Sequence, residues 1–229
     1  MANILITGAN RGLGLEMVKQ SLAAGHTVTA TAREPATATD LNDTEAHVLP
    51  LDVTDPTSVE ALAMAVGEDS IDILINNAGA FFERETPDMF ELTPEQLMDT
   101  YRVNAVGPWM VTRALAAKVA RSDRKLIVQI SSMMGSCAMA MESKAGGHLA
   151  YRSSKSALNM LNVLMAGALA EREITTVAMH PGWVQMDMGG AEATLEIPDA
   201  VGRILRTVHG IKPGQSGAFV DLDGKTMPW

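Results

Sequence analysis

Several features that mark other classes of protein are scarce in this chain. Its 229 residues include one cysteine, Cys137, so an intrachain disulfide is excluded. Eighteen basic against 27 acidic residues give a net charge of −9, which disfavours nucleic acid and anionic membranes as partners. No apolar run approaches the roughly 20 residues of a membrane-spanning helix. The start, MANILITG, lacks a signal peptide's basic segment and cleavage site, so we expect a cytoplasmic protein.

Metal-ligand spacing is also missing. The histidines of the chain show no metal-ligand spacing, so we predict no metal centre. We therefore interpret as surface, packing or loop residues the five histidines, His26, His47, His148, His180 and His209.

Short apolar segments alternate with helical patterns along the whole chain. Each apolar segment lacks a polar face, which is typical of parallel strands covered on both sides by helices. We expect strands at 3–6, 26–32, 46–51, 71–75, 125–130 and 175–179, and helices at 13–22, 57–66, 93–120 and 149–171. The sequence therefore predicts one α/β domain over residues 1–229, a Rossmann-like doubly wound parallel sheet with helices on both faces.

The run TGANRGLG at residues 7–14 lies between the first strand and the first helix. Gly8 can adopt a positive φ for a sharp turn, while Gly12 and Gly14 remove side chains where a pyrophosphate approaches and helix packs on sheet. Backbone N–H groups of the first helical turn then face the anion. This arrangement predicts a dinucleotide site, the alternative being an ordinary glycine-rich turn. Its expected wall is formed by Gly8, Asn10, Arg11, Gly12, Leu13 and Gly14.

The end of the second strand indicates which dinucleotide is bound. Sites for NAD(H) usually carry an acid there for the ribose 2′-hydroxyl, whereas this chain has Ala32 and Arg33, with Arg11 in the glycine turn. Two cations without an acid favour NADP(H) over NAD(H), unless both arginines are solvated surface charges. Asp52 and Val53 follow the third strand and would hydrogen-bond and cover the adenine, unless Asp52 is a cap or turn residue.

Acid–base chemistry is expected at Ser132, Tyr151 and Lys155. Tyr151 and Lys155 are four residues apart, so they share one face of a helix that begins near residue 149. A nearby ammonium favours phenolate and moves the pKa of a tyrosine toward useful acid–base work. Ser132, at the end of the fifth strand, would hold the substrate oxygen. Alone, the tyrosine–lysine spacing is also compatible with an amphipathic tyrosine beside a solvated lysine.

Taken together, the motifs of this chain resemble the short-chain dehydrogenase/reductase family in its compact form. They occur in order over nearly the whole chain: TGANRGLG, Asp52-Val53, NNAG at 76–79, Asn104 in VNAVGP, the ISS that ends at Ser132, YRSSK at 151–155 and HPG at 180–182. ISSMMGS, AYRSSKSALN, HPGWV and GAFVDLDGKTMPW are further similar to the C-factor and sniffer-like carbonyl reductases.

The resemblance implies a role for each matching residue. Tyr151 would be the proton donor or acceptor, Lys155 would lower its pKa and bind the nicotinamide ribose, and Ser132 would orient the carbonyl. Asn104 would complete a proton relay through water, or alternatively satisfy backbone groups inside a helix. Further cofactor contacts are implied for Asn77, Ala78, Gly79, Pro181, Gly182 and Val184.

One position departs from the family pattern. The threonine that usually follows PGxV by two residues and bonds the nicotinamide carboxamide is replaced here by Met186. A thioether cannot donate a hydrogen bond. Backbone groups, Gln185 or Asp187 would then hold the carboxamide, and we expect Met186→Thr to lower the Michaelis constant for cofactor.

Two long segments after strands, at about 133–147 and 186–198, are expected to be substrate loops. Methionines in them favour an adaptable apolar pocket for varied carbonyl compounds, although methionine also fills ordinary cores. The residues concerned are Met133, Met134, Met139, Met141, Trp183, Met186 and Met188.

The leading hypothesis is an NADPH-dependent carbonyl reductase in which Tyr151 delivers the proton to an aldehyde or ketone. The alternative is a dinucleotide-binding sensor or signalling protein with little turnover. The resemblance also implies a homodimer or homotetramer through the helices at 93–120 and 149–171. Apolar residues there, such as Met110, Leu115, Met160 and Leu164, are the candidates for that contact, unless they only pack inward.

Overall fold

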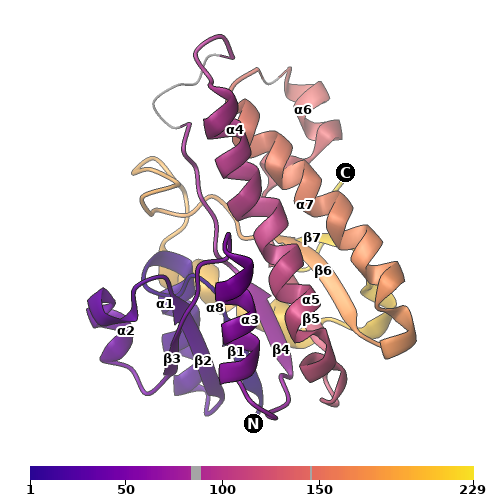
Figure 1. Cartoon of the computed structure of the whole chain (residues 1–229). Coiled ribbons are helices and arrows are strands. Elements are labelled where there is room, and N and C mark those ends of the chain that lie inside the picture. Colours follow the sequence, from indigo (N-terminus) through magenta and orange to yellow (C-terminus); the bar gives the residue numbers. More distant parts are fainter. Residues whose placement is uncertain (84–88, 145) are drawn as a thin grey trace.

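Seven parallel strands form one sheet in the centre of the computed structural model, which describes residues 1–83, 89–144 and 146–229 (Figure 1). Their order is β3-β2-β1-β4-β5-β6-β7, so the chain changes direction across the sheet between β1 and β4. This is the doubly wound arrangement, which places a ligand crevice at that switch point. The strands are β1 (Asn3–Ile6), β2 (Thr27–Ala32), β3 (His47–Pro50), β4 (Ile73–Asn76), β5 (Leu126–Ile130), β6 (Thr175–His180) and β7 (Phe219–Asp221).

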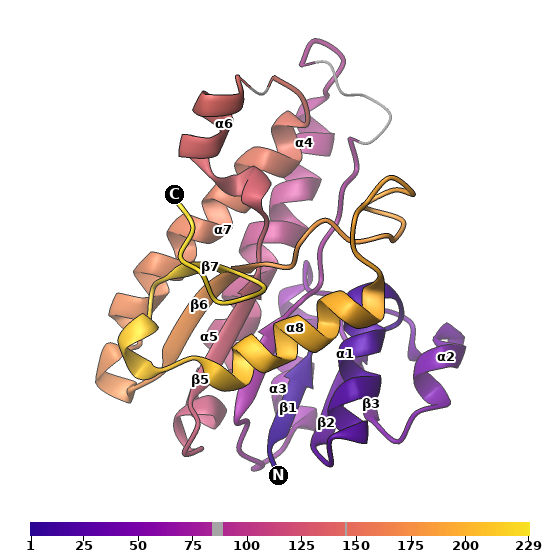
Figure 2. The same cartoon turned by 180° about the vertical axis from the view of Figure 1, so that it is seen from behind.

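Helices cover both faces of the sheet, which confirms the predicted fold class. α3 (Pro56–Ala65), α5 (Gly107–Ala120) and α7 (Leu149–Ala168) lie on one face (Figure 1). α1 (Gly12–Ala23) and α8 (Ile197–Gly210) lie on the other (Figure 2).

The core is divided by the sheet into two apolar clusters. Ile4 and Ile6 of β1 pack with α1 and α8, whereas Leu5 between them packs with α3 and α5. This alternation follows from the two-residue period of a strand. Because both faces are covered, the strands need no polar face, as the sequence predicts.

The single helix expected at 93–120 is interrupted. α4 (Pro94–Tyr101) begins at a capping box in which the Thr93 hydroxyl accepts from the Gln96 N–H at 3.2 Å. A π-helical turn, Arg102–Val106, then leads into α5. Single π turns inside helices frequently occur at functional sites, and this one carries Asn104.

The segment expected as a loop at 133–147 contains regular structure. A 3-10 turn, Met133–Gly135, is followed by α6 (Cys137–Ser143), where the Ser136 hydroxyl accepts from the Met139 N–H at 3.1 Å. Serine caps of this kind are local signals that the glycine and methionine content of the segment obscures. Other elements outside the predictions are α2 (Thr39–Asn42), α8, β7 and the 3-10 turns Pro35–Thr37 and Pro213–Gln215. The helix expected at 149–171 ends at Ala168 and is followed by a 3-10 turn, Ala170–Arg172.

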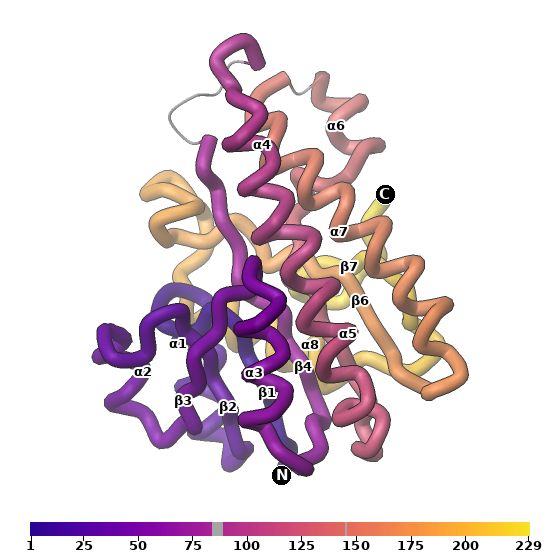
Figure 3. Tube along the Cα trace, in the orientation of Figure 1, coloured from indigo at the N-terminus to yellow at the C-terminus, as the bar shows by residue number. Residues whose placement is uncertain are grey.

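The segments expected to bind ligands leave the sheet at one edge. In a parallel sheet the carboxyl ends of all strands meet there, opposite the N-terminus (Figure 3). The chain after β4 and the chain after β6 both extend from this edge and line the same cavity. Among the described residues, no helix has the length and apolar character needed to cross a membrane.

Candidate active site

A cavity of about 1150 Å³ opens at the carboxyl edge of the sheet, across the switch point between β1 and β4. It joins the glycine turn, the ends of β2 and β4, the segment after β6 and the first turns of α7. Most of the predicted site residues line it: Gly8, Asn10, Arg11, Gly12, Leu13, Gly14, Arg33, Asp52, Val53, Asn77, Ala78, Gly79, Tyr151, Lys155 and Pro181.

The glycine turn has the backbone shape that its sequence predicts. Gly8 has φ 63°, and a Cβ atom there would lie 2.8 Å from the Ala78 Cα. At Gly14 a Cβ atom would lie 2.6 Å from the Asn77 amide nitrogen, which donates to the Thr7 and Gly8 carbonyls at 3.0 Å each. Asn77 thus fixes the turn as well as lining the cavity. Gly12 is more open, since its nearest neighbour would be the Met186 sulfur at 3.7 Å.

The groups expected around the adenine combine local structure with exposure to the cavity. The Asp52 Oδ1 accepts from the Thr54 N–H at 2.8 Å and the Thr54 hydroxyl at 2.7 Å. These bonds, with a contribution from the Arg33 charge, lower the pKa of Asp52 below its ordinary value despite partial burial. Asp52 therefore is a turn residue, as the alternative interpretation predicts, and it also lines the cavity.

Arg11 is held across the mouth of the cavity by the chain that follows β6. Its Nη1 forms an exposed ion pair with the Asp187 carboxylate at 2.6 Å. An exposed pair of this kind stabilises a protein by at most about 1 kcal/mol. The charge of Arg11 is thus partly neutralised by Asp187, whereas Arg33 lines the cavity near Asp52.

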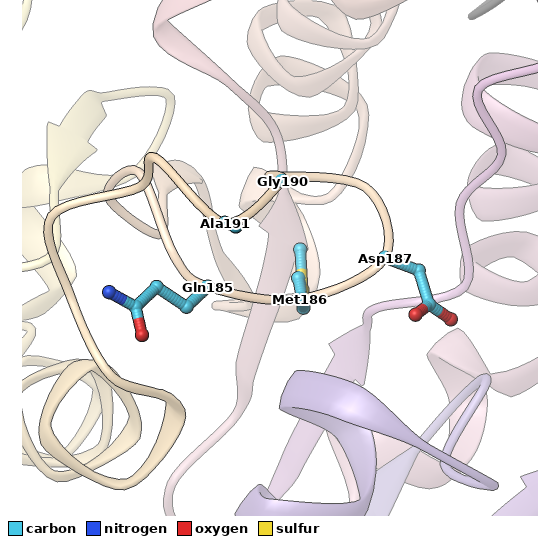
Figure 4. Close-up of a pocket in the computed structure, with 5 residues that line it drawn as sticks. All are labelled: Gln185, Met186, Asp187, Gly190 and Ala191. Atoms are coloured by element: carbon cyan, nitrogen blue, oxygen red, sulfur yellow. The ribbon is translucent and has the colours of Figure 1, made fainter.

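Met186 lies between the glycine turn and the apolar core, against which it packs. Its neighbours Gln185 and Asp187 point in opposite directions around a small pocket of about 360 Å³ (Figure 4). The Gln185 amide donates to the Ala193 carbonyl at 2.9 Å. Gln185 and Asp187 are the two side chains expected to replace the missing threonine in binding the carboxamide. In this structure the Gln185 amide is bonded to Ala193 and the Asp187 carboxylate to Arg11.

Tyr151 and Lys155 share the inner face of α7, and both are buried. The Lys155 Nζ lies 5.8 Å from the Tyr151 ring centre and donates to the Ile130 carbonyl at 2.8 Å. Burial raises the pKa of Tyr151 to about 12, partly opposed by a hydrogen bond with Ser132. Burial lowers the pKa of Lys155 to about 8. The shift of Tyr151 is opposite to the one expected from the ammonium alone, because desolvation outweighs it.

Ser132 lies beside Tyr151 at the end of β5 without being part of the cavity lining. Its Oγ accepts from the Met134 N–H at 3.1 Å, which starts the turn that follows. A Cβ atom on Gly135 of that turn would lie 2.7 Å from the Lys155 carbonyl carbon, so the turn after β5 and α7 approach closely there. The close approach brings Ser132 to the tyrosine.

The Asn104 side chain is fully engaged by protein groups. It accepts from the Ala80 N–H at 2.8 Å and donates to the Ala80 carbonyl at 2.8 Å and the Ser154 hydroxyl at 3.0 Å. It is buried and does not line the cavity. Its side chain therefore satisfies backbone groups, as the alternative interpretation predicts, and joins the π turn to the chain after β4 and to α7.

The HPG segment contributes unevenly to the cavity. Pro181 lines it, but Gly182 and Val184 do not. Gly182 has φ 88°, where a Cβ atom would lie 2.6 Å from a methyl group of Leu195. Val184 is buried and pairs with Leu195 in an isolated bridge. Both positions shape the segment around Met186.

Several lining residues lie outside the predicted set. An apolar pair directly after NNAG, Phe81 and Phe82, reaches the cavity, and the Phe81 ring centre lies 4.8 Å from that of Tyr151. The sequence signal that could have identified this pair is its position just after the NNAG motif. Others are Glu34, Thr37, Thr54, Asp99, Arg102, Val103, Ile130, Ser131 and Ile197.

Of the methionine-rich segments, only the second supplies cavity residues. Met186 and Met188 line the cavity, whereas no described residue of 133–147 does. Met141 of α6 is exposed. Within the described part of the chain, no group of three potential metal ligands comes together.

Comparisons with known proteins agree with the geometry. The family model for short chain dehydrogenases matches residues 2–196. C-signal of Myxococcus xanthus is 38% identical over 177 residues, covering 75% of this chain and all of that protein. Short-chain dehydrogenase RED3 of Pyricularia oryzae is 30% identical and covers 99% of this chain and 98% of its own.

Solved structures extend the likeness to the whole chain. The NADPH-bound carbonyl reductase from chicken fatty liver superposes with a TM-score of 0.92 at 33% identity, covering 100% of this chain and 99% of that one. The carbonyl reductase Sniffer of D. melanogaster has a TM-score of 0.92 at 32% identity, with both chains fully covered. The motifs, the sheet order and these matches together show that the chain belongs to the short-chain dehydrogenase family.

Proposed function

We propose that this chain is an NADPH-dependent reductase of aldehydes or ketones. The observation that carries the proposal is the buried Tyr151–Lys155 pair beside Ser132, at the inner end of a cavity whose outer end holds the glycine turn and Arg33. One cavity thus joins a site for a phosphorylated dinucleotide to an acid–base pair, as a hydride-transfer enzyme requires.

The chain's own groups hold the substrate and supply the proton. The bound nicotinamide would supply the hydride. Tyr151 donates the phenolic proton to the carbonyl oxygen, which Ser132 holds by a second hydrogen bond. Lys155 stabilises the phenolate left behind, since a cation near the ring favours the charged form. In this proposal Asn104 acts through the π turn that carries it, because its amide is already engaged.

The nucleotide preference rests on charge at the outer end of the cavity. Arg33 lies directly after β2, at the place where sites for NAD(H) usually carry an acid, and it is the better candidate than Arg11 for a 2′-phosphate. Backbone N–H groups at the start of α1 face the cavity and suit the pyrophosphate. Gly8, Gly12 and Gly14 leave the room that this contact needs.

The substrate end of the cavity is apolar. Phe81 lines the cavity against the Tyr151 ring, and Phe82 and Met188 add apolar lining, so we propose that the substrate carries an aromatic or aliphatic group next to its carbonyl. The segment at 186–198 acts as a substrate loop, since Met186 and Met188 line the cavity. The segment at 133–147 contributes indirectly, since Gly135 packs closely against Lys155 of α7.

We further propose that two or four copies associate through the α4–α5 and α7 surface. Met160 and Leu164 of α7 are each 60% exposed, and Trp109 of α5 is 37% exposed, whereas Met110 and Leu115 are buried and belong to the core. Light scattering tests this: a mass of 24.4 kDa at working concentration contradicts association. Location in the cytoplasm is a separate expectation, tested by cell fractionation.

The decisive experiment measures NADPH oxidation with a panel of aldehydes, ketones and quinones. We expect turnover that falls by a factor of about 100 or more in Tyr151→Phe, because general acid catalysis contributes about 10²–10⁴-fold. Strict selectivity for one polar, sugar-like substrate contradicts the apolar pocket.

A signalling role is the second candidate, since one relative carries the name C-signal. Nucleotide binding without any turnover that depends on Tyr151 favours that role over the reductase.

A further inference from the structure

The N-terminus of α7 lacks an ordinary cap. The residue before it, His148, has a left-handed backbone with φ 58°, and its side chain makes no capping hydrogen bond. The first N–H groups of a helix have no partner within the helix, and leaving them unpaired in a buried place is costly. This matters because the third residue of α7 is Tyr151.

A carboxylate from another part of the chain takes the place of the cap. Glu83, four residues after NNAG, accepts from the Ala150 N–H at 2.9 Å with one oxygen and from the Tyr151 N–H at 2.6 Å with the other. It is 1% exposed, although glutamate is almost never fully buried without partners. An anion at the positive end of a 20-residue helix is also favourable electrostatically.

The same short segment holds the tyrosine side chain. Phe81, two residues before Glu83, lies 4.8 Å from the Tyr151 ring and 4.9 Å from the His148 ring, measured between ring centres. Residues 81–83 therefore hold the first turn of α7 by its backbone through Glu83 and by its rings through Phe81. Residues 81–83 follow Asn77–Gly79, which line the proposed nucleotide site.

We infer that Glu83 is a positioning residue, whose buried carboxylate fixes the backbone of Tyr151 and so places the phenol beside Lys155 and Ser132. The inference deepens the proposed function and rests on it for the role of the phenol. Glu83 does not line the cavity and touches neither nucleotide nor substrate in this scheme. Its loss is therefore expected to affect the chemical step more than nucleotide binding.

The test compares Glu83→Gln with a matched variant at another acidic cap. Glutamine keeps the size of the side chain, but its NH₂ group meets a backbone N–H, so one hydrogen bond and the charge are lost. Asp55→Asn also replaces a capping carboxylate by an amide, at the exposed start of α3, where Asp55 Oδ1 accepts from the Thr57 N–H at 2.9 Å and the asparagine oxygen can keep that bond. Both variants are assayed for kcat, for NADPH affinity by fluorescence and for melting temperature.

We expect Glu83→Gln to lower kcat about tenfold with NADPH affinity within about twofold of wild type, since small displacements of a catalytic group are costly. Asp55→Asn should leave kcat unchanged. Wild-type kcat in Glu83→Gln overturns the inference, and so does a parallel loss of kcat and NADPH affinity. If Glu83→Gln fails to fold, Glu83→Asp is assayed instead, because aspartate keeps the carboxylate on a shorter side chain. We expect a severalfold lower kcat in Glu83→Asp, and an unchanged kcat overturns the inference.

Two further measurements separate this inference from the proposed function. Tyr151→Phe with wild-type turnover removes the proposed acid role, whatever Glu83 does. Amide hydrogen exchange at residues 149–155 then tests, without any assay of turnover, whether Glu83 holds the start of α7. Faster exchange in Glu83→Gln than in wild type supports the inference, and unchanged exchange overturns it.

Discussion

The Lys155 Nζ lies 5.8 Å from the centre of the Tyr151 ring and is held there by a 2.8 Å hydrogen bond to the Ile130 carbonyl. The bond ties α7 to the end of β5, where Ser132 follows. Because both ionisable groups are buried, their protonation states depend on one another and on whatever enters the cavity.

The pH dependence of reduction should follow Lys155. With a pKa of about 8 its ammonium is lost as the pH rises, while Tyr151, with a pKa raised to about 12, stays protonated through this range. We expect kcat for reduction to be constant below about pH 7 and to fall by up to tenfold per pH unit above 8. Steady-state kinetics from pH 6 to 10 checks this, and a flat profile up to pH 10 contradicts it.

Lys155→Met should abolish activity but stabilise the fold. Because the pKa of Lys155 is lowered, the folded state binds fewer protons than the unfolded chain between about pH 8 and 10.5. The free energy of unfolding therefore rises with pH in this range. Below about pH 8 the buried ammonium lowers the free energy of unfolding by its full amount. Methionine removes this penalty. We expect the free energy of unfolding at pH 7 to increase by an amount on the order of 1–3 kcal/mol. Each unit of pKa shift corresponds to about 1.4 kcal/mol, and the loss of the hydrogen bond to the Ile130 carbonyl reduces the gain. Denaturant unfolding measures it, and a less stable variant contradicts it.

Met186→Thr should improve the use of cofactor. The methionine sulfur faces Gly12, and neither Gln185 nor Asp187 is free to replace the family's threonine. A threonine hydroxyl restores a donor at this position and is expected to lower the Michaelis constant for NADPH severalfold. Steady-state titration of NADPH gives the answer. Met186→Val, which has the shape of threonine without its hydroxyl, is the control, and an unchanged constant in Met186→Thr is the contrary outcome.

Arg33→Ala should reduce the discrimination between the two dinucleotides. A charge-assisted contact to a 2′-phosphate is worth about 1.5–3 kcal/mol, so NADPH affinity should fall at least tenfold while NADH affinity changes little. Arg11→Ala is the comparison, and its effect should be smaller because Arg11 is paired with Asp187. Fluorescence titration of both nucleotides tests this, and tighter binding of NADH than NADPH by the wild-type chain overturns it.

Much of the fold could be predicted because its signals are local. Buried strands are apolar throughout, and the helix starts at 93–94 and near 149 were expected within a residue or so. Gly8 needs a positive φ wherever this turn occurs. Among the elements outside the predictions, β7 depends on tertiary packing, because it has only three residues and pairs with β6. α6 and α8 do have local signals, a serine cap at Ser136 and a proline in the first turn of α8.

By itself, the sequence determined which chemistry the chain carries, since the glycine spacing, the tyrosine–lysine spacing and the arginine directly after β2 are properties of neighbouring residues. Only the tertiary structure decided how these groups are charged and held. Burial raises the pKa of Tyr151, the Asn104 amide is taken up by Ala80 and Ser154, and Glu83 reaches α7 from 67 residues away. Desolvation and long-range hydrogen bonds arise from segments brought together by folding, and no local pattern encodes them.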